Sequence, residues 1–404
     1  MKARKPPDRW LTPGVRGIGG ASLLADLGHE VPSSLLPSLL TSTLGAPAAA
    51  LGLIEGVADG VAGAARFVGG VVSDDPRRRR SLAVGGYGAT AVLSSLIGAA
   101  TAVWQVAVLR VGAWAARGLR VPARNALLAD ITGPGTYGRA YGFERMMDNL
   151  GAVGGPLLAL ALVAALGLRG AILVSVVFGL GAVAAIVYAI RHIQRPLPLI
   201  RSSPRIRLRP LLQGRLGRLW APVGAFEVGN VAATLLILRA VELLTPARGV
   251  DGATRTALLL YAGHNLAAAA ISVPAGRAAD RFGFRRVLAA GFVAGLAGYA
   301  VLALAGPSVA VLAAGFSAAG VAIGIAETAE HGAVAEAAPE EVRGSAFGLL
   351  AAIQSFGNLA ASGVAGLLWT LLSARAAFTF AAGAMVVAVV GAILTAGGGH
   401  QPDS

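Results

Sequence analysis

Long apolar runs, each long enough to cross a bilayer, alternate with short polar segments along the whole chain. A membrane-spanning helix needs roughly 20 mostly apolar residues. The pattern predicts six spans in the first part of the chain, at residues 16–42, 47–72, 82–102, 105–128, 137–166 and 170–190. Six more are predicted at residues 219–245, 255–275, 287–305, 309–334, 345–371 and 376–397. We therefore expect an all-α integral membrane protein with about 12 transmembrane helices.

The composition supports this class and removes several others. Hydrophobic residues make up 55% of the chain and charged residues 13%, whereas soluble domains have about 25% charged residues. The net charge is +14, but no soluble stretch is long enough to carry a basic patch for nucleic acid, so no nucleic-acid partner is expected. Cysteine is absent, which excludes disulfides and cysteine-ligated metal sites. We expect neither a metal nor a cofactor.

The arginines predict the orientation in the membrane. Basic clusters at residues 77–80, 191–218 and 277–286 all fall on one side if the spans alternate, and the opposite loops hold few charges. Short loops rich in Arg stay in the cytoplasm, so both termini are expected there, in a multi-pass protein of the cell (inner or plasma) membrane. The expected parts are a cytoplasmic N-terminal segment at 1–15, a six-helix half at 16–192, a basic linker at 193–217, a second half at 218–397 and a cytoplasmic tail at 398–404.

The two halves repeat each other. Residues 70–74 match residues 276–280, and residues 138–142 match residues 344–348, both at an offset of 206 residues. Two matches at one offset indicate duplication of a six-span unit. Parallel repeats of this kind enclose a solute site near the middle of the bilayer, so we expect two six-helix pseudo-repeats around a central cavity.

At these residues the chain resembles the major facilitator superfamily over nearly its whole length. The family's loop signature, G-x-x-x-D-[R/K]-x-G followed by bases, fits Gly276, Asp280, Arg281, Gly283 and Arg285. The first-half copy keeps Gly70, Asp74 and Arg78, but it has Asp75 where a base is usual and Arg77 where Gly is usual. The resemblance implies transport by alternating access, loops that gate one side, and a protein that works as a monomer.

A second signature, G-x₈-G-x₃-G-P-x₂-G, occurs in the fifth span of proton-coupled antiporters of this family. Gly142, Gly151, Gly155 and Pro156 match it, and Ala159 replaces the last glycine. The resemblance implies proton-coupled efflux. The alternative is a plain packing seam, because small residues let membrane helices approach closely wherever they occur.

Many of the carboxylates lie inside predicted spans, where each charge costs about 2.5–3.5 kcal/mol. Asp26, His29 and Glu30 share one face of the first span, and Glu55 and Asp59 share a face of the second. Carboxylates clustered in a low-dielectric site can exchange protons near neutral pH, which makes these five residues candidates for proton coupling. The alternative is a permanent network of ion pairs that braces the two halves.

The fourth span carries an arginine stripe, defined by Arg110, Arg117, Arg120 and Arg124. By helical geometry the four lie on one face, which cannot point to lipid. Arg117 and Arg120 are candidates to bind an anionic group of the solute, or else the stripe neutralises the acids of neighbouring spans. By the resemblance, spans one, four, seven and ten line the cavity, which adds four further solute-cavity candidates: Glu227, Asn230, Glu327 and Glu330.

Other classes of function fit the sequence less well. It has no H-E-x-x-H or G-x-S-x-G motif, no cysteine nucleophile and no lysine in any span, so an intramembrane enzyme is not expected. The expected partners are the lipid bilayer, a small-molecule solute and protons. Three functions stay open: proton-coupled efflux of a drug-like or metabolite solute, uptake or exchange of a polar or anionic solute without proton coupling, and a receptor or scaffold that does not transport.

Overall fold

The computed structural model describes residues 10–192 and 207–396. The start of the predicted N-terminal segment, most of the basic linker and all of the tail lie outside the described residues. Within these two ranges every regular element is a helix and there is no strand. The predicted all-helical class is therefore confirmed.

The first half consists of six long helical segments that run between the two ends of the molecule. Its elements are α1 (Pro13–Ser38), η1 (Leu39–Thr43), α2 (Ala48–Val72), α3 (Pro76–Leu96), η2 (Ile97–Ala99), α4 (Val103–Ile131), α5 (Tyr137–Val174) and α6 (Val176–Arg191). The fifth and sixth helical segments are joined at Gly167, whose φ of 70° lets the chain reverse its direction inside α5. Thr12 caps α1, since its hydroxyl accepts a hydrogen bond from the Val15 amide at 3.4 Å.

The second half repeats this plan. Its elements are α7 (Leu208–Leu212), α8 (Gly214–Gly229), α9 (Ala233–Phe282), α10 (Phe284–Leu304), α11 (Val309–Ala337), η3 (Glu340–Val342), α12 (Arg343–Leu371) and α13 (Ala374–Ala396). The helix α8 and the first part of α9 form the seventh helical segment, which is interrupted at residues 230–232. Gly249, with a φ of 67°, makes the turn from the seventh to the eighth helical segment.

The structure corrects two loop boundaries. The arginines at 77–80 lie in the first turns of α3, because Asp75 caps this helix by accepting from the Arg77 amide at 3.0 Å. In the second half, α9 runs through Asp280, and only Gly283 (φ 91°) separates it from α10. The capping Asp75 explains how the first half turns without a glycine at the corresponding place.

The outside of the bundle suits a bilayer. Seven of the described helical segments are long and apolar enough to cross a membrane by length and composition alone. The helices α1, α2 and α4, which hold most of the predicted charged clusters, are not among them. Large apolar side chains cover the outer surface, such as Leu259 and Leu394, which are 73% and 74% exposed. Hydrocarbon is the environment that such a surface matches.

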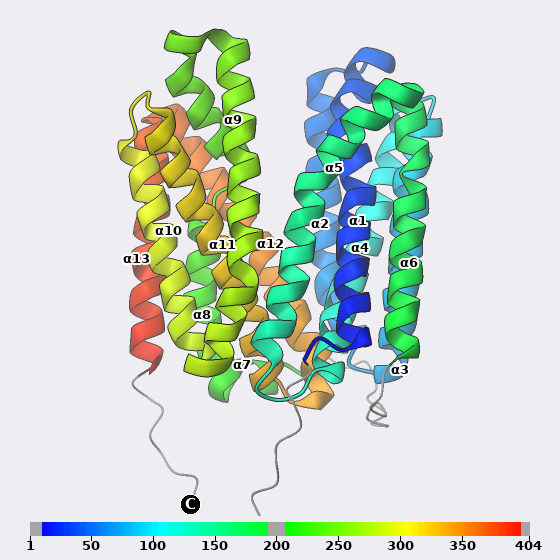
Figure 1. Cartoon of the computed structure of the whole chain (residues 1–404), viewed down its shortest axis with the longest axis vertical. Helices are drawn as coiled ribbons and strands as arrows, with labels where there is room; N and C mark the ends of the chain where they lie inside the picture. The colour runs from blue at the N-terminus through cyan, green and yellow to red at the C-terminus, as the bar shows by residue number, and fades with distance from the viewer. Residues whose placement is uncertain (1–9, 193–206, 397–404) are drawn as a thin grey trace, which may run out of the picture.

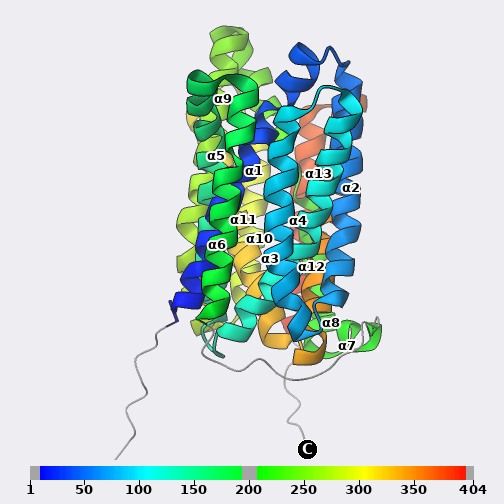
Figure 2. The ribbon, with the colours of Figure 1, turned by 90° about the vertical axis from the view of Figure 1, so that its right-hand side faces the viewer.

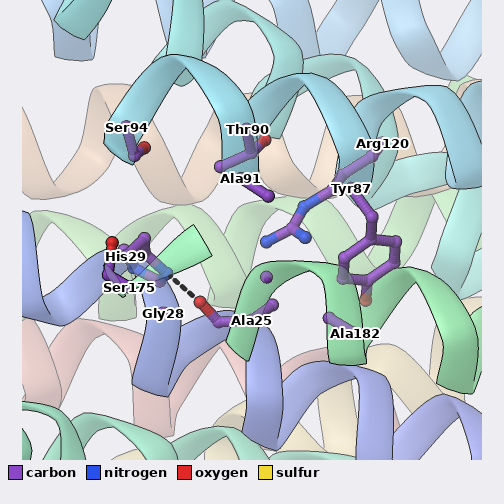
Figure 3. A pocket seen from close by; sticks show the side chains of 11 residues that line it. Ala25, Gly28, His29, Tyr87, Thr90, Ala91, Ser94, Arg120, Ser175 and Ala182 are labelled. Atoms are coloured by element: carbon purple, nitrogen blue, oxygen red, sulfur yellow. Dashed lines mark hydrogen bonds between the residues drawn. The ribbon is translucent and has the colours of Figure 1, made fainter. Parts of the chain in front are cut away.

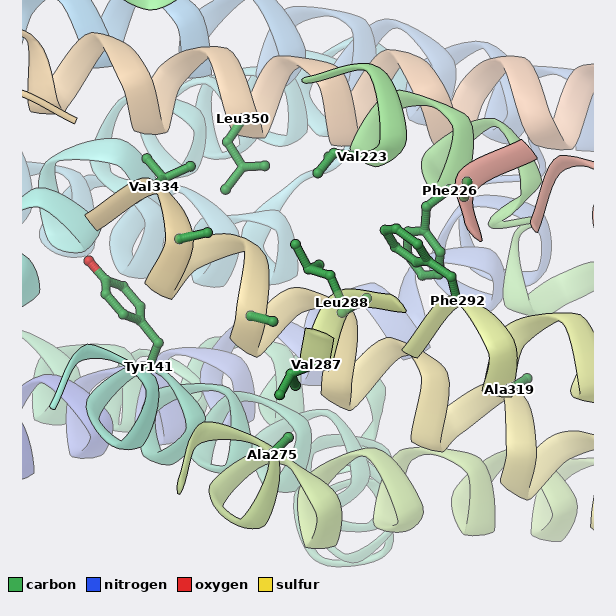
Figure 4. Packing of buried hydrophobic residues seen from close by; sticks show 14 of the residues in the cluster. Tyr141, Val223, Phe226, Ala275, Val287, Leu288, Phe292, Ala319, Val334 and Leu350 are labelled. Atoms are coloured by element: carbon green, nitrogen blue, oxygen red, sulfur yellow. The ribbon is translucent and has the colours of Figure 1, made fainter. Parts of the chain in front are cut away.

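Small residues and a few aromatic rings fill the interior. Alanine and glycine dominate the buried positions, so the helices pack closely. In the second half, Phe226 and Phe292 stack with their ring centres 5.0 Å apart. Tyr141 of the first half belongs to the same buried cluster, which therefore continues across the boundary between halves (Figure 4).

The two halves stand side by side (Figure 1). We call the end with the turns at 73–75, 132–136, 283 and 338–342 the basal end, and the opposite end the distal end. Their ribbons converge at the basal end, where the described chain begins and ends, and diverge toward the distal end (Figure 1). Figure 2 shows α7 beside α8 at the basal end.

Candidate functional site

The basal end is held by a matched pair of aspartates. Asp74 accepts hydrogen bonds from the Ser345 amide at 2.7 Å and from its hydroxyl at 2.5 Å. Asp280 accepts from the amides of Gly138 and Arg139 at 2.7 and 3.1 Å, and from the Arg139 side chain at 2.9 Å. Each aspartate thus binds the first turn of a helix from the other half, where free amides and the helix dipole favour an anion.

The repeat offset relates the two aspartate contacts. Asp74 and Asp280 lie 206 residues apart, and so do their partners Arg139 and Ser345. The glycines of both signatures let the backbones meet: a methyl group on Gly276 would overlap the Gly138 backbone, and one on Gly70 would overlap Gly344 and Gly348. The duplicated sequence therefore forms a basal latch of pseudo-two-fold symmetry, defined here by Asp74, Ser345, Asp280, Gly138 and Arg139.

At the basal end the buried arginine of the first half is Arg79, in place of the predicted Arg78. Arg79 contacts Asp130 at 2.6 Å, and Asp130 also binds Arg343 of the other half at 3.0 Å. Arg78 is half exposed and pairs only locally with Asp75 at 3.6 Å. Arg281 lies over the ring of Phe282, and Arg285 lies in the first turn of α10. Neither Arg78 nor Arg281 joins the halves through a contact among the described residues.

A cavity of about 570 Å³ lies between the halves. Its wall on the first half carries eight charged side chains: Asp26, Asp59, Arg66, Arg117, Arg120, Arg124, Arg145 and Asp148. Its wall on the second half is mainly uncharged and polar, with two acids: Glu227, Asn230, Glu327, His331, Gln354, Ser355, Asn358 and Ser362. The cavity is large enough for a small-molecule ligand and lined to bind a polar one.

The structure brings the predicted α1 cluster together. The Nδ1 of His29 lies 2.8 Å from the carbonyl oxygen of Ala25 and 3.2 Å from Asp26 Oδ1. Since a carbonyl only accepts, Nδ1 carries the hydrogen. The other ring nitrogen, Nε2, lies 3.4 Å from Glu30 Oε1. The imidazole therefore sits between the two carboxyl groups, as the helical spacing predicted.

A second carboxyl group meets Asp26 from α5. The side chains of Asp26 and Asp148 lie close enough to interact directly. A proton on one of the two carboxyl groups would let them form a hydrogen bond. Arg117 approaches the same Asp26 oxygen at 3.6 Å, and all three residues line the cavity. The sequence did not single out this pairing, because periodicity shows which residues share a helix face and not which faces meet.

The glycines of the fifth-span signature allow the close approach of α5 to α1. A methyl group on Gly151 would come within 2.7 Å of Asp26 Cβ, and one on Gly155 would overlap the Glu30 side chain. Gly142 instead faces the Ser272 backbone of the other half, and Pro156 lies in α5 beside Gly155. Gly151 and Gly155 therefore let α5 approach α1 where its carboxylates lie.

The arginine stripe is only partly neutralised. Arg110 pairs with Glu55 at 2.9 Å, and Arg124 pairs with Glu144 at 2.7 Å. Arg117 has a looser contact with Asp26 and is one-quarter exposed, whereas Arg120 has no ion pair among the described residues. The two predicted roles of the stripe thus fall on different arginines: those at its ends neutralise acids, and the middle two keep donors available.

Beside the cavity, Arg145 connects the first half to the second. Arg145 of α5 binds Glu144 at 2.7 Å and Asp148 at 3.3 Å, and reaches Glu327 of α11 at 3.6 Å. In the structure it lies beside the carboxyl pair and crosses the boundary between halves.

The remaining predicted residues lie on or behind the cavity wall. Asp59 accepts from the indole of Trp114 at 2.9 Å and lines the cavity, but Glu55 does not line it. Asn230 donates to Glu227 at 3.2 Å at the break between α8 and α9. Glu330 is buried behind the wall, where it accepts from Gln354 at 2.9 Å.

These features define a class: a helical membrane carrier whose two similar halves enclose a polar cavity and are locked at one end. The chain belongs to the Major Facilitator Superfamily, whose family model matches residues 18–247 and 240–401. Membership in this family makes it a secondary transporter in general terms, and points to a protein without an enzymatic role.

Similar chains cover almost the whole protein. An uncharacterized MFS-type transporter of Methanocaldococcus jannaschii is 27% identical over 405 residues, covering 96% of this chain and 95% of that one. An uncharacterized protein of Mycobacterium tuberculosis is 28% identical over 349 residues, covering 84% of this chain and 82% of the other. These relatives extend the family assignment without adding a substrate.

Solved structures share the fold at low identity. A bacterial homologue of the iron transporter ferroportin in an outward-facing state has a TM-score of 0.75 at 16% identity, covering 95% of this chain and 99% of that one. The human organic anion transporter MFSD10 has a TM-score of 0.71 at 17% identity, covering 96% and 100%. The transporter FucP in the outward conformation has a TM-score of 0.70 at 16% identity, covering 94% and 98%.

Proposed function

We propose that this protein is a proton-coupled antiporter that exports a small polar solute by alternating access. The observation that carries the proposal is the carboxyl pair of Asp26 and Asp148 on the cavity wall, because two adjacent carboxyl groups can share one proton where a solute would bind. Loss of that proton leaves two anionic groups facing the cavity. A solute with a cationic or hydrogen-bond-donating group then competes with the proton for the same site.

The packing of α5 on α1 supports antiport. Gly151 and Gly155, which match the antiporter signature, lie against Asp26 and Glu30. A change at the carboxyl pair therefore acts directly on the seam between these helices. His29 lies between Asp26 and Glu30 and offers a route for the proton along α1.

We further propose that the halves at 16–192 and 218–397 rock as units around the cavity, with the basal end in the cytoplasm. The basic residues near the basal end support this orientation. The basal latch then closes the cytoplasmic side, and the 1–15 segment, the linker and the tail lie in the cytoplasm of a cell with an inner or plasma membrane.

The orientation can be tested with single cysteines, since the native chain has none. In intact cells, a membrane-impermeant maleimide is expected to label Val250→Cys at the distal end and not Arg78→Cys at the basal end. The opposite labelling would reverse the assigned direction of transport.

The function itself is tested in proteoliposomes that report internal pH. Drugs, amines and polar metabolites are added one at a time under an imposed pH gradient. We expect proton movement that appears only with a transported solute and disappears in Asp26→Asn. Solute movement with no proton movement would refute proton coupling.

One observation favours a second function, uptake or exchange of an anionic solute without proton coupling. Arg66 and Arg117 both line the cavity, and Arg66 contacts Ser355 across the halves. A carboxylate or phosphate group would find two guanidinium donors there. In the same assay this function predicts movement of an anionic solute that Arg117→Gln abolishes and Asp26→Asn spares. A receptor or scaffold predicts no solute movement at all.

A further inference from the structure

An open groove of about 340 Å³ lies at the basal end, where the turn before α5 meets the last turns of α9. Gly135 and Arg139 line it from the first half, and Arg277, Asp280 and Arg281 line it from the second. The helices α5 and α9 pack together along one side of the molecule, which faces the viewer in Figure 1 and lies on the left in Figure 2. The groove therefore opens on the seam between the halves, at the edge of the bundle.

Two of the three arginines in this groove have no counterion among the described residues. Arg277 is exposed, and it forms no hydrogen bond or ion pair within the described ranges. Arg281 is also exposed, and its guanidinium carbon lies 5.0 Å from the centre of the Phe282 ring. The carboxylate of Asp280 is already bound by Arg139 and by two backbone amides. The groove therefore carries a net positive charge and offers donors to an anion.

Arginines inside the first half are compensated by the protein itself. The guanidinium carbon of Arg120 lies 3.9 Å from the centre of the Tyr87 ring, as Figure 3 shows, and its charge is partly offset by Asp26. Arg110 and Arg124 of the same helix each contact a carboxylate. The arginines of the basal groove differ from these because they are open to the surroundings, where an external anion can reach them.

The basic charge is confined to one of the two seams between the halves. At the positions that correspond to the three groove arginines by the repeat offset, the opposite seam has Ser345, Val71 and Asp75. Orientation in the membrane requires arginines on the cytoplasmic side, but it does not require them on one particular seam. The unequal distribution therefore indicates a local ligand on the seam of α5 and α9.

An apolar ring adjoins the groove. Phe282 directly follows Arg281 and is 52% exposed at the basal end of an apolar outer surface. A small hydrophilic anion gains no favourable contact from such a ring. A phospholipid does, because it presents an anionic phosphate together with acyl chains.

We propose that this groove binds the phosphate group of an anionic phospholipid, through Arg277 and Arg281 of the second half and Arg139 of the first. Guanidinium groups bind phosphate through paired hydrogen bonds, and basic pockets between membrane helices bind acidic headgroups. The walls of the groove come from both halves, so the groove is complete only while the basal latch is closed. A bound headgroup therefore stabilises the closed basal end.

Binding is tested with the full-length protein in a neutral detergent that contains phosphatidylcholine. Phosphatidylglycerol is added, and the lipid bound per chain is counted by native mass spectrometry. We expect saturable binding of one phosphatidylglycerol per chain, no comparable binding of phosphatidylcholine, and retention of the lipid in excess inorganic phosphate. Absence of saturable binding would overturn the proposal, and so would displacement by inorganic phosphate, which would indicate a site for the free ion.

Three variants locate the lipid. Arg277→Gln and Arg281→Gln are each expected to weaken binding roughly tenfold, because each removes a hydrogen bond to a charged group. Arg286→Gln is the matched control, since Arg286 is an exposed arginine near the basal end that does not line the groove. Its affinity is expected to stay unchanged. Equal weakening by all three variants would indicate general attraction to a basic surface and would contradict a defined site.

The effect on the latch is measured by maleimide labelling of Ala346→Cys, a buried position next to Ser345. Replacing phosphatidylcholine by phosphatidylglycerol in nanodiscs should slow labelling about fivefold, the lower end of typical coupling between a ligand and a conformational equilibrium. Adding Arg277→Gln should remove this difference. Equal labelling in both lipids would contradict the role in closure. Neither readout uses a transported solute, so the result is independent of whether proton coupling is correct.

Discussion

The two halves of the protein can be compared position by position, because the repeat offset is 206 residues. In each half a glycine of the fifth helix presses on an acidic residue of the first. Gly151 lies against Asp26, and its counterpart Gly357 lies against Glu227. Both halves thus bring an acid to the cavity wall by the same close helix packing.

The surroundings of the acids differ. Arg124 and Asp148 of the first half lie 3.8 Å apart, and the corresponding residues of the second half are Glu330 and Gln354, joined by a 2.9 Å hydrogen bond. The first half therefore has a network of opposite charges, whereas the second half has an acid and an amide. We infer that the first half handles the proton and that the second contributes mainly hydrogen bonds to the solute.

The largest effect is expected on removing the cation that supports the first-half network. Arg145→Gln leaves Arg124 as the cation shared by Glu144 and Asp148, and breaking a buried ion pair costs about 3–5 kcal/mol. The corresponding residue of the second half is Ala351, so that half has no equivalent weakness. The measurement is the melting temperature in detergent.

Glu327→Gln is the matched control for Arg145→Gln. It removes only the 3.6 Å contact of a partly exposed acid with Arg145, so we expect a loss of about 1 kcal/mol or less. Equal destabilisation by the two variants would contradict a network centred in the first half.

A large effect on coupling is expected from Asp26→Asn. The variant cannot exchange the proton shared with Asp148, so accumulation of solute driven by a pH gradient should fall roughly a hundredfold, equivalent to about 2.7 kcal/mol. Exchange of solute for solute without a gradient should continue, because the cavity remains. Both rates are measured in the same proteoliposomes.

Asp59→Asn changes another carboxylate of the cavity wall, one that is held by Trp114. A smaller loss of pH-driven accumulation is expected from it. A loss as large as that of Asp26→Asn would extend the proton site to α2, and the assignment to the Asp26–Asp148 pair would then be wrong.

An intermediate effect is expected from the paired glycines. Gly151→Ala pushes α5 from Asp26 and should weaken proton coupling, whereas Gly357→Ala pushes α12 from Glu227 and should weaken solute affinity. Overpacking of this kind costs about 1–3 kcal/mol, or roughly tenfold in the affected step. Measured proton-to-solute ratios and solute affinities separate the two. The comparison fails if both variants change the same quantity.

The smallest effect concerns pH at the basal latch. Burial raises the pKa of Asp74 above its ordinary value of 3.8 in the closed state, although hydrogen bonds from Ser345 and the charge of Arg79 oppose the rise. The closed state then holds this proton more tightly than the open state. Protonation of Asp74 therefore stabilises the closed basal latch. This stabilisation is complete below pH 3.8 and is lost as the pH rises through the raised pKa of the closed state.

A cysteine at Ala346, which is buried next to Ser345, reports this closure. Labelling of Ala346→Cys is expected to fall slightly, less than about threefold, when the pH is lowered from 7 toward 4. Adding Asp74→Asn should remove the dependence. An increase in labelling on acidification would have the wrong sign for this account.

The sequence predicted those features that depend on one helix or on the repeat. The all-helical fold with two similar halves followed from the span lengths and the offset of 206 residues. The clustering of Asp26, His29 and Glu30 followed from their i, i+3, i+4 spacing. These features need no knowledge of how helices rotate against each other. The offset also places Asp74 and Asp280 in equivalent positions, as the basal latch shows.

What the sequence did not predict depends on contacts between helices. The partner of Asp26 on α5, the burial of Arg79 in place of Arg78, and the position of Glu330 behind the wall all follow from how two helix faces meet. A signal for the first existed: Asp148 precedes Gly151 by three residues, so both lie on one face of α5, and a glycine on that face indicates a close neighbour.

The most direct test of the central claim is proton release on solute binding, measured with a pH dye in weakly buffered detergent solution. The account predicts that a transported solute releases close to one proton per bound molecule, and that Asp148→Asn and Asp26→Asn each bind solute with little or no release. Unchanged release in both variants, or binding by the native protein without release, would contradict the claim that the Asp26–Asp148 pair carries the exchanged proton.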